Sequence, residues 1–161
     1  MMKKIKILTL LLTIITFTSC GFKPIYKLTE GNFSHSNYLI EFDNDPGYLI
    51  KNKILETYSA SSSQSLYKIN LRTDQGSTPL ITNTDGTVSK YRIEVVISFE
   101  VADTSLGNRI YEDISRGFSE YLVQTSEITT DEKRKQAIEI ATNEAIQMMS
   151  IKIQSHIQQS Q

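Results

Sequence analysis

The chain has 161 residues, with 17 lysines and arginines against 18 aspartates and glutamates, a length that suits one domain better than two. Without a basic surplus it lacks the surface that nucleic-acid binding requires. Its single cysteine excludes an internal disulfide and a thiolate metal site, and two histidines leave little imidazole for a metal. We therefore expect a single domain without metal or cofactor.

The first 19 residues have the layout of a secretory signal peptide. Three lysines form a basic start, an uncharged apolar run occupies residues 7–17, and small residues at 18 and 19 precede Cys20. The run is shorter than the ~20 apolar residues that a membrane-spanning helix needs. Cleavage before Cys20 would remove the three lysines and leave 14 basic against 18 acidic residues, a net charge of −4.

Cys20 would then be the first residue of the mature chain, which is where a bacterial lipoprotein pathway attaches lipid. Its sulfur would take a diacylglyceryl group, and the freed amine can be acylated too. Phe17 stands where such sequences usually carry Leu, and it is apolar enough to fill the same place. We expect Cys20 to be lipidated; the alternative is an ordinary cysteine near a conventional cleavage site.

The residues that follow, Cys20-Gly21-Phe22-Lys23-Pro24-Ile25-Tyr26, resemble the C-G-F-x-P-x-Y opening of mature lipopolysaccharide-assembly lipoproteins, the LptE family. Gly21 after the cysteine, rather than Asp, also resembles lipoproteins sent to the outer membrane. The resemblance implies a lipid-anchored protein on the periplasmic side of the outer membrane. It further implies that the protein plugs a β-barrel translocon, helps it assemble, and contacts lipopolysaccharide during export.

A second hypothesis from a different class is a generic outer-membrane lipoprotein that serves as a periplasmic scaffold or pilot protein for another envelope complex. The opening motif separates the two, because a generic lipoprotein has no reason to carry it.

The next residues, 20–37, are mostly polar, and we interpret them as a tether to a single domain over 38–161. Aromatic and apolar residues predict a strand over 38–42. Asp45 as an N-cap, followed by Pro46 at the first helical position, predicts a helix over 46–58 with one apolar face.

A polar loop over 59–65 precedes a second predicted strand over 66–71. Residues 73–87 are rich in Gly, Asp, Asn, Ser and Thr, and Asp85-Gly86 is a turn signal, so we expect a long projecting loop between antiparallel strands. Strict alternation of apolar and polar residues predicts a strand over 90–103 with one solvated face.

The returning strand is predicted over 109–123, with Tyr111 and Tyr121 on one face and Gly117 in its interior as a bulge or bend. Its other face carries Ile110, Ile114, Phe118 and Leu122, interrupted by Glu112, Arg116 and Glu120.

Thr129 and Glu132 form a capping box that predicts the start of a long C-terminal helix. One apolar stripe follows that helix, formed by Ile138, Ala141, Ala145, Met149, Ile153 and Ile157. The order β-α-β-β-β-α predicts an α+β two-layer sandwich, with a four-stranded mixed sheet and two helices on one face. The first strand should pair in parallel with a later one, because a helix separates it from the next strand.

We find no arrangement that indicates catalysis. His35 falls in the tether and His156 near the C-terminus, so neither has a rigid frame, and no phosphate-binding glycine loop or zinc motif occurs. We therefore expect a binding protein and not an enzyme.

Lipopolysaccharide carries anionic phosphates, so a net negative protein needs a local basic cluster to bind it. The sheet can build such a cluster from Lys68, Arg72, Lys90, Arg92 and Arg116, with Arg72 and Lys90 flanking one loop. The alternative is that these are solubilising charges paired with Glu94 and Glu100.

Overall fold

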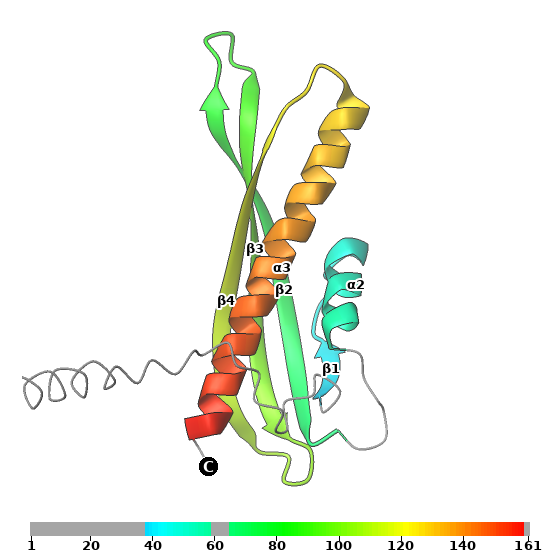
Figure 1. Ribbon diagram of the computed structural model, residues 1–161, viewed down its shortest axis with the longest axis vertical. Coiled ribbons are helices and arrows are strands. Elements are labelled where there is room, and N and C mark those ends of the chain that lie inside the picture. Colours follow the sequence, from blue (N-terminus) through cyan, green and yellow to red (C-terminus); the bar gives the residue numbers. More distant parts are fainter. Residues whose placement is uncertain (1–37, 59–64, 160–161) are drawn as a thin grey trace, which may run out of the picture. The chain divides into compact units, whose positions relative to one another are not determined.

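The computed structural model of the chain describes residues 38–58 and 65–159 (Figure 1). The predicted signal peptide, Cys20 and the tether lie outside the described residues. No helix in the described part is long and apolar enough to cross a membrane. The elements follow the predicted order: β1 (Tyr38–Phe42), α2 (Tyr48–Thr57), β2 (Tyr67–Thr82), β3 (Val88–Asp103), β4 (Arg109–Leu122) and α3 (Glu127–Gln159).

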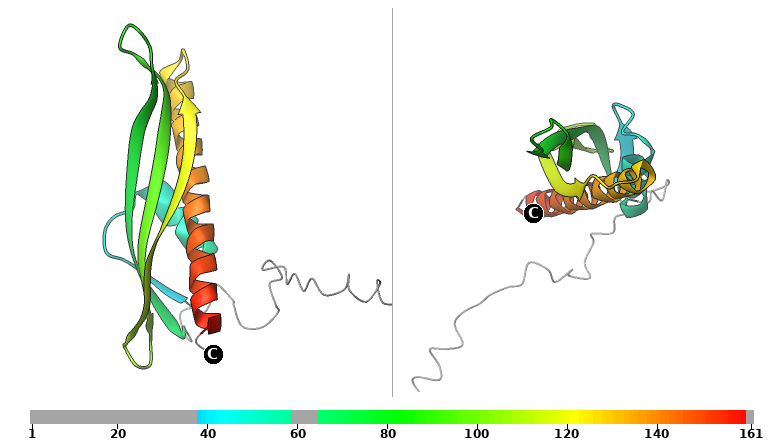
Figure 2. Two further views of the ribbon diagram at one scale, coloured as in Figure 1. Left: turned by 90° about the vertical axis from the view of Figure 1, so that its left-hand side faces the viewer. Right: turned by 90° about the horizontal axis from the view of Figure 1, so that it is seen from above.

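The four strands form one sheet in the order β1-β2-β3-β4. β1 pairs in parallel with β2, and the other neighbours are antiparallel. Figure 2 shows the strands as one layer and the helices as the other. The predicted α+β sandwich, with a four-stranded mixed sheet and a β-α-β-β-β-α order, is confirmed.

The core lies between β3 and α3. Alternate residues of β3, from Ile93 to Val101, are at most 3% exposed, and they face the helical layer. The predicted stripe of α3 is buried along its whole length, from Ile138 to Ile157. α2 adds Ile50 and Ile54 to the same core, and β1, which is confirmed at its predicted bounds, adds Tyr38.

α2 begins two residues later than predicted. Gly47 precedes the helix with a φ of +76°, a conformation that suits glycine, and this turns the chain so that Pro46 lies outside the helix. Asp45 accepts a hydrogen bond from the N–H of Gly47 at 3.1 Å and does not cap the first helical turn. The prediction of a cap at Asp45 was therefore wrong.

The predicted loop over 73–87 is mostly strand. β2 extends to Thr82 and pairs with β3 along this whole length, because backbone hydrogen bonds hold polar residues in a strand as well as apolar ones. The turn is confined to residues 83–87. There Gly86 has a φ of +85° and Asp85 accepts a hydrogen bond from the Thr87 N–H at 2.9 Å, so the Asp-Gly turn signal is confirmed.

α3 begins at Glu127, before the predicted capping box. The Ser126 carbonyl accepts the Thr130 N–H at 3.0 Å, which adds a helical turn upstream. Thr129 and Glu132 therefore lie inside the helix, and the predicted cap was wrong.

Candidate interaction surface

The middle of β4 is lined by small residues on the side that faces α3. Ser115 and Gly117 are buried there, and a Cβ added at Gly117 would lie 1.9 Å from the carbonyl oxygen of Ala141 and 2.6 Å from the nitrogen of Ala145. Only a glycine lets the backbone of α3 come this close. β4 pairs regularly with β3 at this point, so the predicted bulge at Gly117 was wrong and close helix packing explains the glycine.

The opposite side of β4 belongs to the free face of the sheet. Four large apolar side chains stand there, with exposed fractions between 38% and 54%. Glu112, Arg116 and Glu120 alternate with them along the same face. Large exposed side chains that recur at a regular spacing on one face are a candidate interaction site. We call this row the β4 stripe, and it consists of Ile110, Ile114, Phe118 and Leu122.

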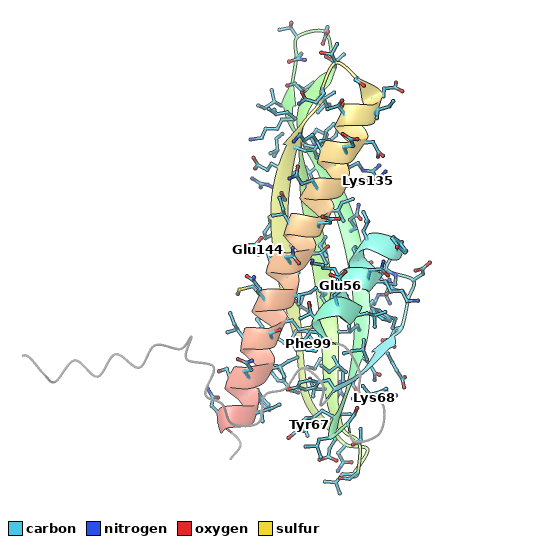
Figure 3. The ribbon with its side chains drawn as sticks, turned by 45° about the vertical axis from the view of Figure 1, so that its right-hand side comes forward. Glu56, Tyr67, Lys68, Phe99, Lys135 and Glu144 are labelled. Carbon is cyan, nitrogen blue, oxygen red and sulfur yellow. The ribbon has the colours of Figure 1, made fainter. Side chains whose placement is uncertain are left out.

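Two side chains of α3 cover part of the outer edge of β4. Glu144 accepts a hydrogen bond from the Phe118 N–H at 2.6 Å, and Lys152 donates to the Ile114 carbonyl at 2.6 Å. Figure 3 shows Glu144 on the side of α3 next to β4. Ile140 and Met148, one turn before and after Glu144, are 50% and 43% exposed. The helix therefore adds exposed apolar residues beside the β4 stripe.

Two of the predicted basic residues meet beside this stripe. Lys90 and Arg92 on β3 both form ion pairs with Glu120 on β4, the second at 3.0 Å. The hydrogen bond from Lys90, and to a smaller extent the one from Arg92, holds the pKa of Glu120 below its ordinary value. The carboxylate therefore stays ionised at neutral pH. We call these three residues the Glu120 cluster, and its formal charge is +1.

Two shallow hollows adjoin the Glu120 cluster. The first, of about 450 Å³, is lined by Lys90 and Leu122 from the sheet and by Lys133 and Ile140 from α3. The second, of about 410 Å³, is lined by Arg92 and Phe118 among others. The sequence does not indicate Lys133 as a member of the basic site. Only the crossing of α3 over the sheet brings it to the same hollow as Lys90.

The other predicted basic residues do not join this cluster. Arg116 pairs with Glu94 at 3.5 Å on the same face, as the alternative interpretation predicted. Lys68 pairs with Glu41 at 2.8 Å near the far end of the sheet (Figure 3).

Arg72 does not flank the same loop as Lys90. It lies opposite Ser98, whereas Lys90 lies opposite Ile81. Eight residues of strand separate the two positions along β3, or roughly 26 Å at ~3.3 Å per residue. The prediction of one shared cluster was wrong for Arg72, because residues 73–82 form a strand and not a loop.

One cluster of titratable groups lies at the junction of β4 and α3. His156 stacks on Tyr111 with ring centroids 4.3 Å apart. Tyr111 donates to Asp113 at 2.8 Å, and Lys152 pairs with the same carboxylate at 2.9 Å. Burial raises the pKa of Tyr111 to about 12, and the hydrogen bond from Lys152 lowers that of Asp113. Among the described residues, no group of three His, Cys, Asp or Glu could hold a metal ion.

Comparisons with known proteins find similarity in structure but not in sequence. The sequence matches no protein-family model and no curated protein. A candidate lipoprotein of Caulobacter crescentus has a similar structure, with a TM-score of 0.59 and 12% identity over 73% of this chain and 88% of that one. The solution structure of an uncharacterised lipoprotein B of Nitrosomonas europaea gives a TM-score of 0.54 and 10% identity, over 73% and 85% of the two chains. The likeness establishes the fold, which this chain has in common with these two proteins.

Proposed function

We propose that this protein is an outer-membrane lipoprotein of the lipopolysaccharide-assembly family (LptE), which plugs a β-barrel translocon and contacts lipopolysaccharide. The observation that carries the proposal is the β4 stripe on the free face of the sheet. A protein that acts alone gains nothing by exposing a row of large apolar side chains, whereas a permanent complex buries such a row. The opening motif at Cys20 and a fold found in lipoproteins support the same function.

The β4 stripe can seat a large partner because α3 supports the strand from the other side. α3 packs against the opposite side of β4 at backbone distance and holds its edge through Glu144 and Lys152. Permanent complexes bury areas above ~2,000 Å² that are mainly apolar. The stripe, Ile140 and Met148 would form the apolar centre of such an interface.

The Glu120 cluster suits the anionic end of lipopolysaccharide. Lys90, Arg92 and Lys133 offer cationic donors around the hollows, and Arg can contact a phosphate with two donors at once. Leu122 and Ile140 line the same hollow as Lys90 and can contact an acyl chain. A site of this composition fits an amphiphile with a phosphate and apolar chains.

Lipid attachment is tested by metabolic labelling with a radioactive fatty acid. We expect label on the wild-type protein and none on Cys20→Ser, because the thiol is the acceptor. Label on the variant would contradict the proposed anchor.

Barrel binding is tested by recovery of the tagged protein from detergent extracts of its own cells. We expect an outer-membrane barrel protein in stoichiometric amount. The double variant Phe118→Ser and Leu122→Ser should lower this recovery by at least about tenfold. Ile128→Ser, at a residue of α3 that is 75% exposed and outside the stripe, is the matched control. Recovery of the wild type without a barrel protein would favour the generic scaffold or pilot lipoprotein.

Lipopolysaccharide binding is tested with purified protein and lipopolysaccharide. The double variant Lys90→Glu and Arg92→Glu should weaken binding by about tenfold or more, since it places three acidic groups together. Arg72→Glu changes the charge in the same direction far along the sheet, so it should bind as the wild type does. Equal binding by all three proteins would remove the Glu120 cluster from the function.

A further inference from the structure

The outer edges of the sheet are protected unequally. On one side, α3 covers part of the β4 edge with Glu144 and Lys152. On the other side, β1 covers β2 only over Tyr67–Leu71. β2 continues for eleven residues beyond that point, and its edge there has no neighbouring strand among the described residues.

Asn44 marks the place where the cover of β2 ends. Its side-chain amide donates to the Thr73 carbonyl at 2.7 Å and accepts the Thr73 N–H at 3.0 Å. The side-chain amide thus makes the two hydrogen bonds that a further peptide group would make if β1 continued. These two bonds also show that the backbone groups of Thr73 point away from β3.

The same direction repeats at every second residue of a strand. The N–H and C=O groups of Gln75 and Ser77 therefore also point outward, while their even-numbered neighbours face β3. Within residues 38–58 and 65–159, nothing hydrogen-bonds to these four outward groups. Pro79 is the next residue in this series. It has no N–H, and an edge strand tolerates proline where the N–H would point away from its neighbour. The open edge is thus Asp74–Thr78, between Asn44 and Pro79.

We propose that the edge of β2 over Asp74–Thr78 accepts an extended strand from the same protein that binds the β4 stripe. The proposal rests on the proposed function, which supplies that partner. The open edge continues the line of β1 and is five residues long, which is also the length of β1. An unprotected edge of this kind is a template for strand addition, in which main-chain hydrogen bonds provide the affinity.

The composition of the edge indicates what kind of strand fits. Residues 74–78 are exposed and none is a large apolar residue, and the β2–β3 hairpin extends past the end of α2 (Figure 1). An incoming strand would find no apolar pocket there and would be recognised through its backbone. Asp74 is the one charged residue of the stretch, so a Lys or Arg opposite it would match.

A second copy of this chain is a weaker occupant. A pairing over five polar residues buries far less than the ~1,200 Å² of a stable interface. The strand must therefore belong to a protein that is already held at another surface, and the β4 stripe offers that surface.

Amide hydrogen exchange tests the pairing in the free lipoprotein and in its purified complex with the barrel. We expect the Gln75 and Ser77 amides to exchange at least about tenfold more slowly in the complex. The Gly76 and Thr78 amides face β3 and should be slow in both states. A complex in which Gln75 and Ser77 exchange as in the free chain would refute the strand pairing alone. Absence of any complex would refute the proposed function and the pairing with it.

A matched pair of variants isolates the N–H of Ser77. Ser77→Pro removes an outward donor and no bond to β3, whereas Ser77→Ala keeps the donor and removes only the hydroxyl. We expect Ser77→Pro to lower affinity for the barrel by about fivefold or more, and Ser77→Ala to bind as the wild type. Equal affinities would contradict the pairing. If Ser77→Pro fails to fold, the exchange rates in the wild-type complex decide.

Discussion

β3 and β4 are neighbours in one sheet, yet they distribute their side chains in opposite ways. β3 places large apolar residues toward the helices, from Ile93 to Val101, and charged residues such as Arg92 and Glu94 on the free face. β4 places Ser115 and Gly117 toward the helices in its middle, with Tyr111 and Tyr121 nearer its ends, and the β4 stripe on the free face. The free face is therefore mainly polar over β3, whereas along β4 large apolar residues alternate with the charged Glu112, Arg116 and Glu120.

The position of α3 explains the difference. The helix approaches β4 to backbone distance at Gly117, so no large side chain fits between them. Over β3 the gap is wide enough for Ile and Val, which fill it. The β4 stripe is thus not part of the core, and its side chains remain exposed on the free face.

The largest expected effect is at the closest contact. Gly117→Ala would force a Cβ into the backbone of α3, and we expect it to lower the free energy of unfolding by about 3 kcal/mol or more. Gly76→Ala is the control, because a Cβ there meets nothing within 4 Å and the change should stay within about 0.5 kcal/mol. Urea unfolding measures both. Equal urea midpoints for Gly117→Ala and Gly76→Ala would show that the packing of α3 does not need a glycine at position 117.

The second effect compares one residue of each strand. Ile97→Ala removes a fully buried side chain of β3 and should cost about 2–5 kcal/mol of unfolding free energy. Ile114→Ala removes a side chain of β4 that is 41% exposed, and should cost about 1 kcal/mol or less. Urea unfolding again provides the measurement. A cost for Ile114→Ala as large as that for Ile97→Ala would place the β4 stripe in the core.

The third effect concerns the attachment of α3 to β4. The Lys152 ammonium holds the pKa of Asp113 below its ordinary value. The ion pair therefore stabilises the fold fully above about pH 4, the pKa of an aspartate in the unfolded chain. Its contribution is lost as the pH falls through the lower pKa of Asp113 in the folded protein. Lys152→Met should remove that acid-dependent part. At pH 7 it should cost about 1 kcal/mol or less, since the side chains of the pair are 32% and 35% exposed and solvent screens them.

Melting temperatures from pH 7 down to about 3 measure this effect. Lys53→Met is the control, because it breaks a surface pair with Glu56 within α2 and leaves α3 and β4 untouched. A parallel decline of wild type and Lys152→Met with falling pH would contradict the prediction.

The smallest effect is expected at the ion pairs that join β3 to β4. Glu120→Gln frees Lys90 and Arg92 and should raise affinity for lipopolysaccharide about threefold at pH 7, with little change in stability. The depressed pKa of Glu120 means that the wild-type carboxylate is neutralised only below the ordinary range of a glutamate. Wild-type affinity should therefore approach that of the variant as pH falls through this pKa. Titrations at several pH values measure it, and a constant ratio would exclude Glu120 as the cause.

The sequence by itself determined the elements whose pattern is complete within one segment. The alternation of β3, the β1 strand at 38–42 and the apolar stripe of α3 each follow from the period of apolar residues, because those residues fill one core from one face. The element order then led to the two-layer sandwich. The β4 residues on each face were also foreseen, but the pattern alone did not say which face was inside.

Only the tertiary structure decided features that depend on a neighbour in space. Polar residues 73–82 became strand because β3 offers them backbone partners, and this moved Arg72 away from Lys90. Lys133 joined the hollow beside Lys90 because α3 crosses the sheet there. Gly117 is required because of the path of the α3 backbone, which no local pattern encodes. Side-chain period reports which residues share a face, and the packing distance between layers determines which face is buried.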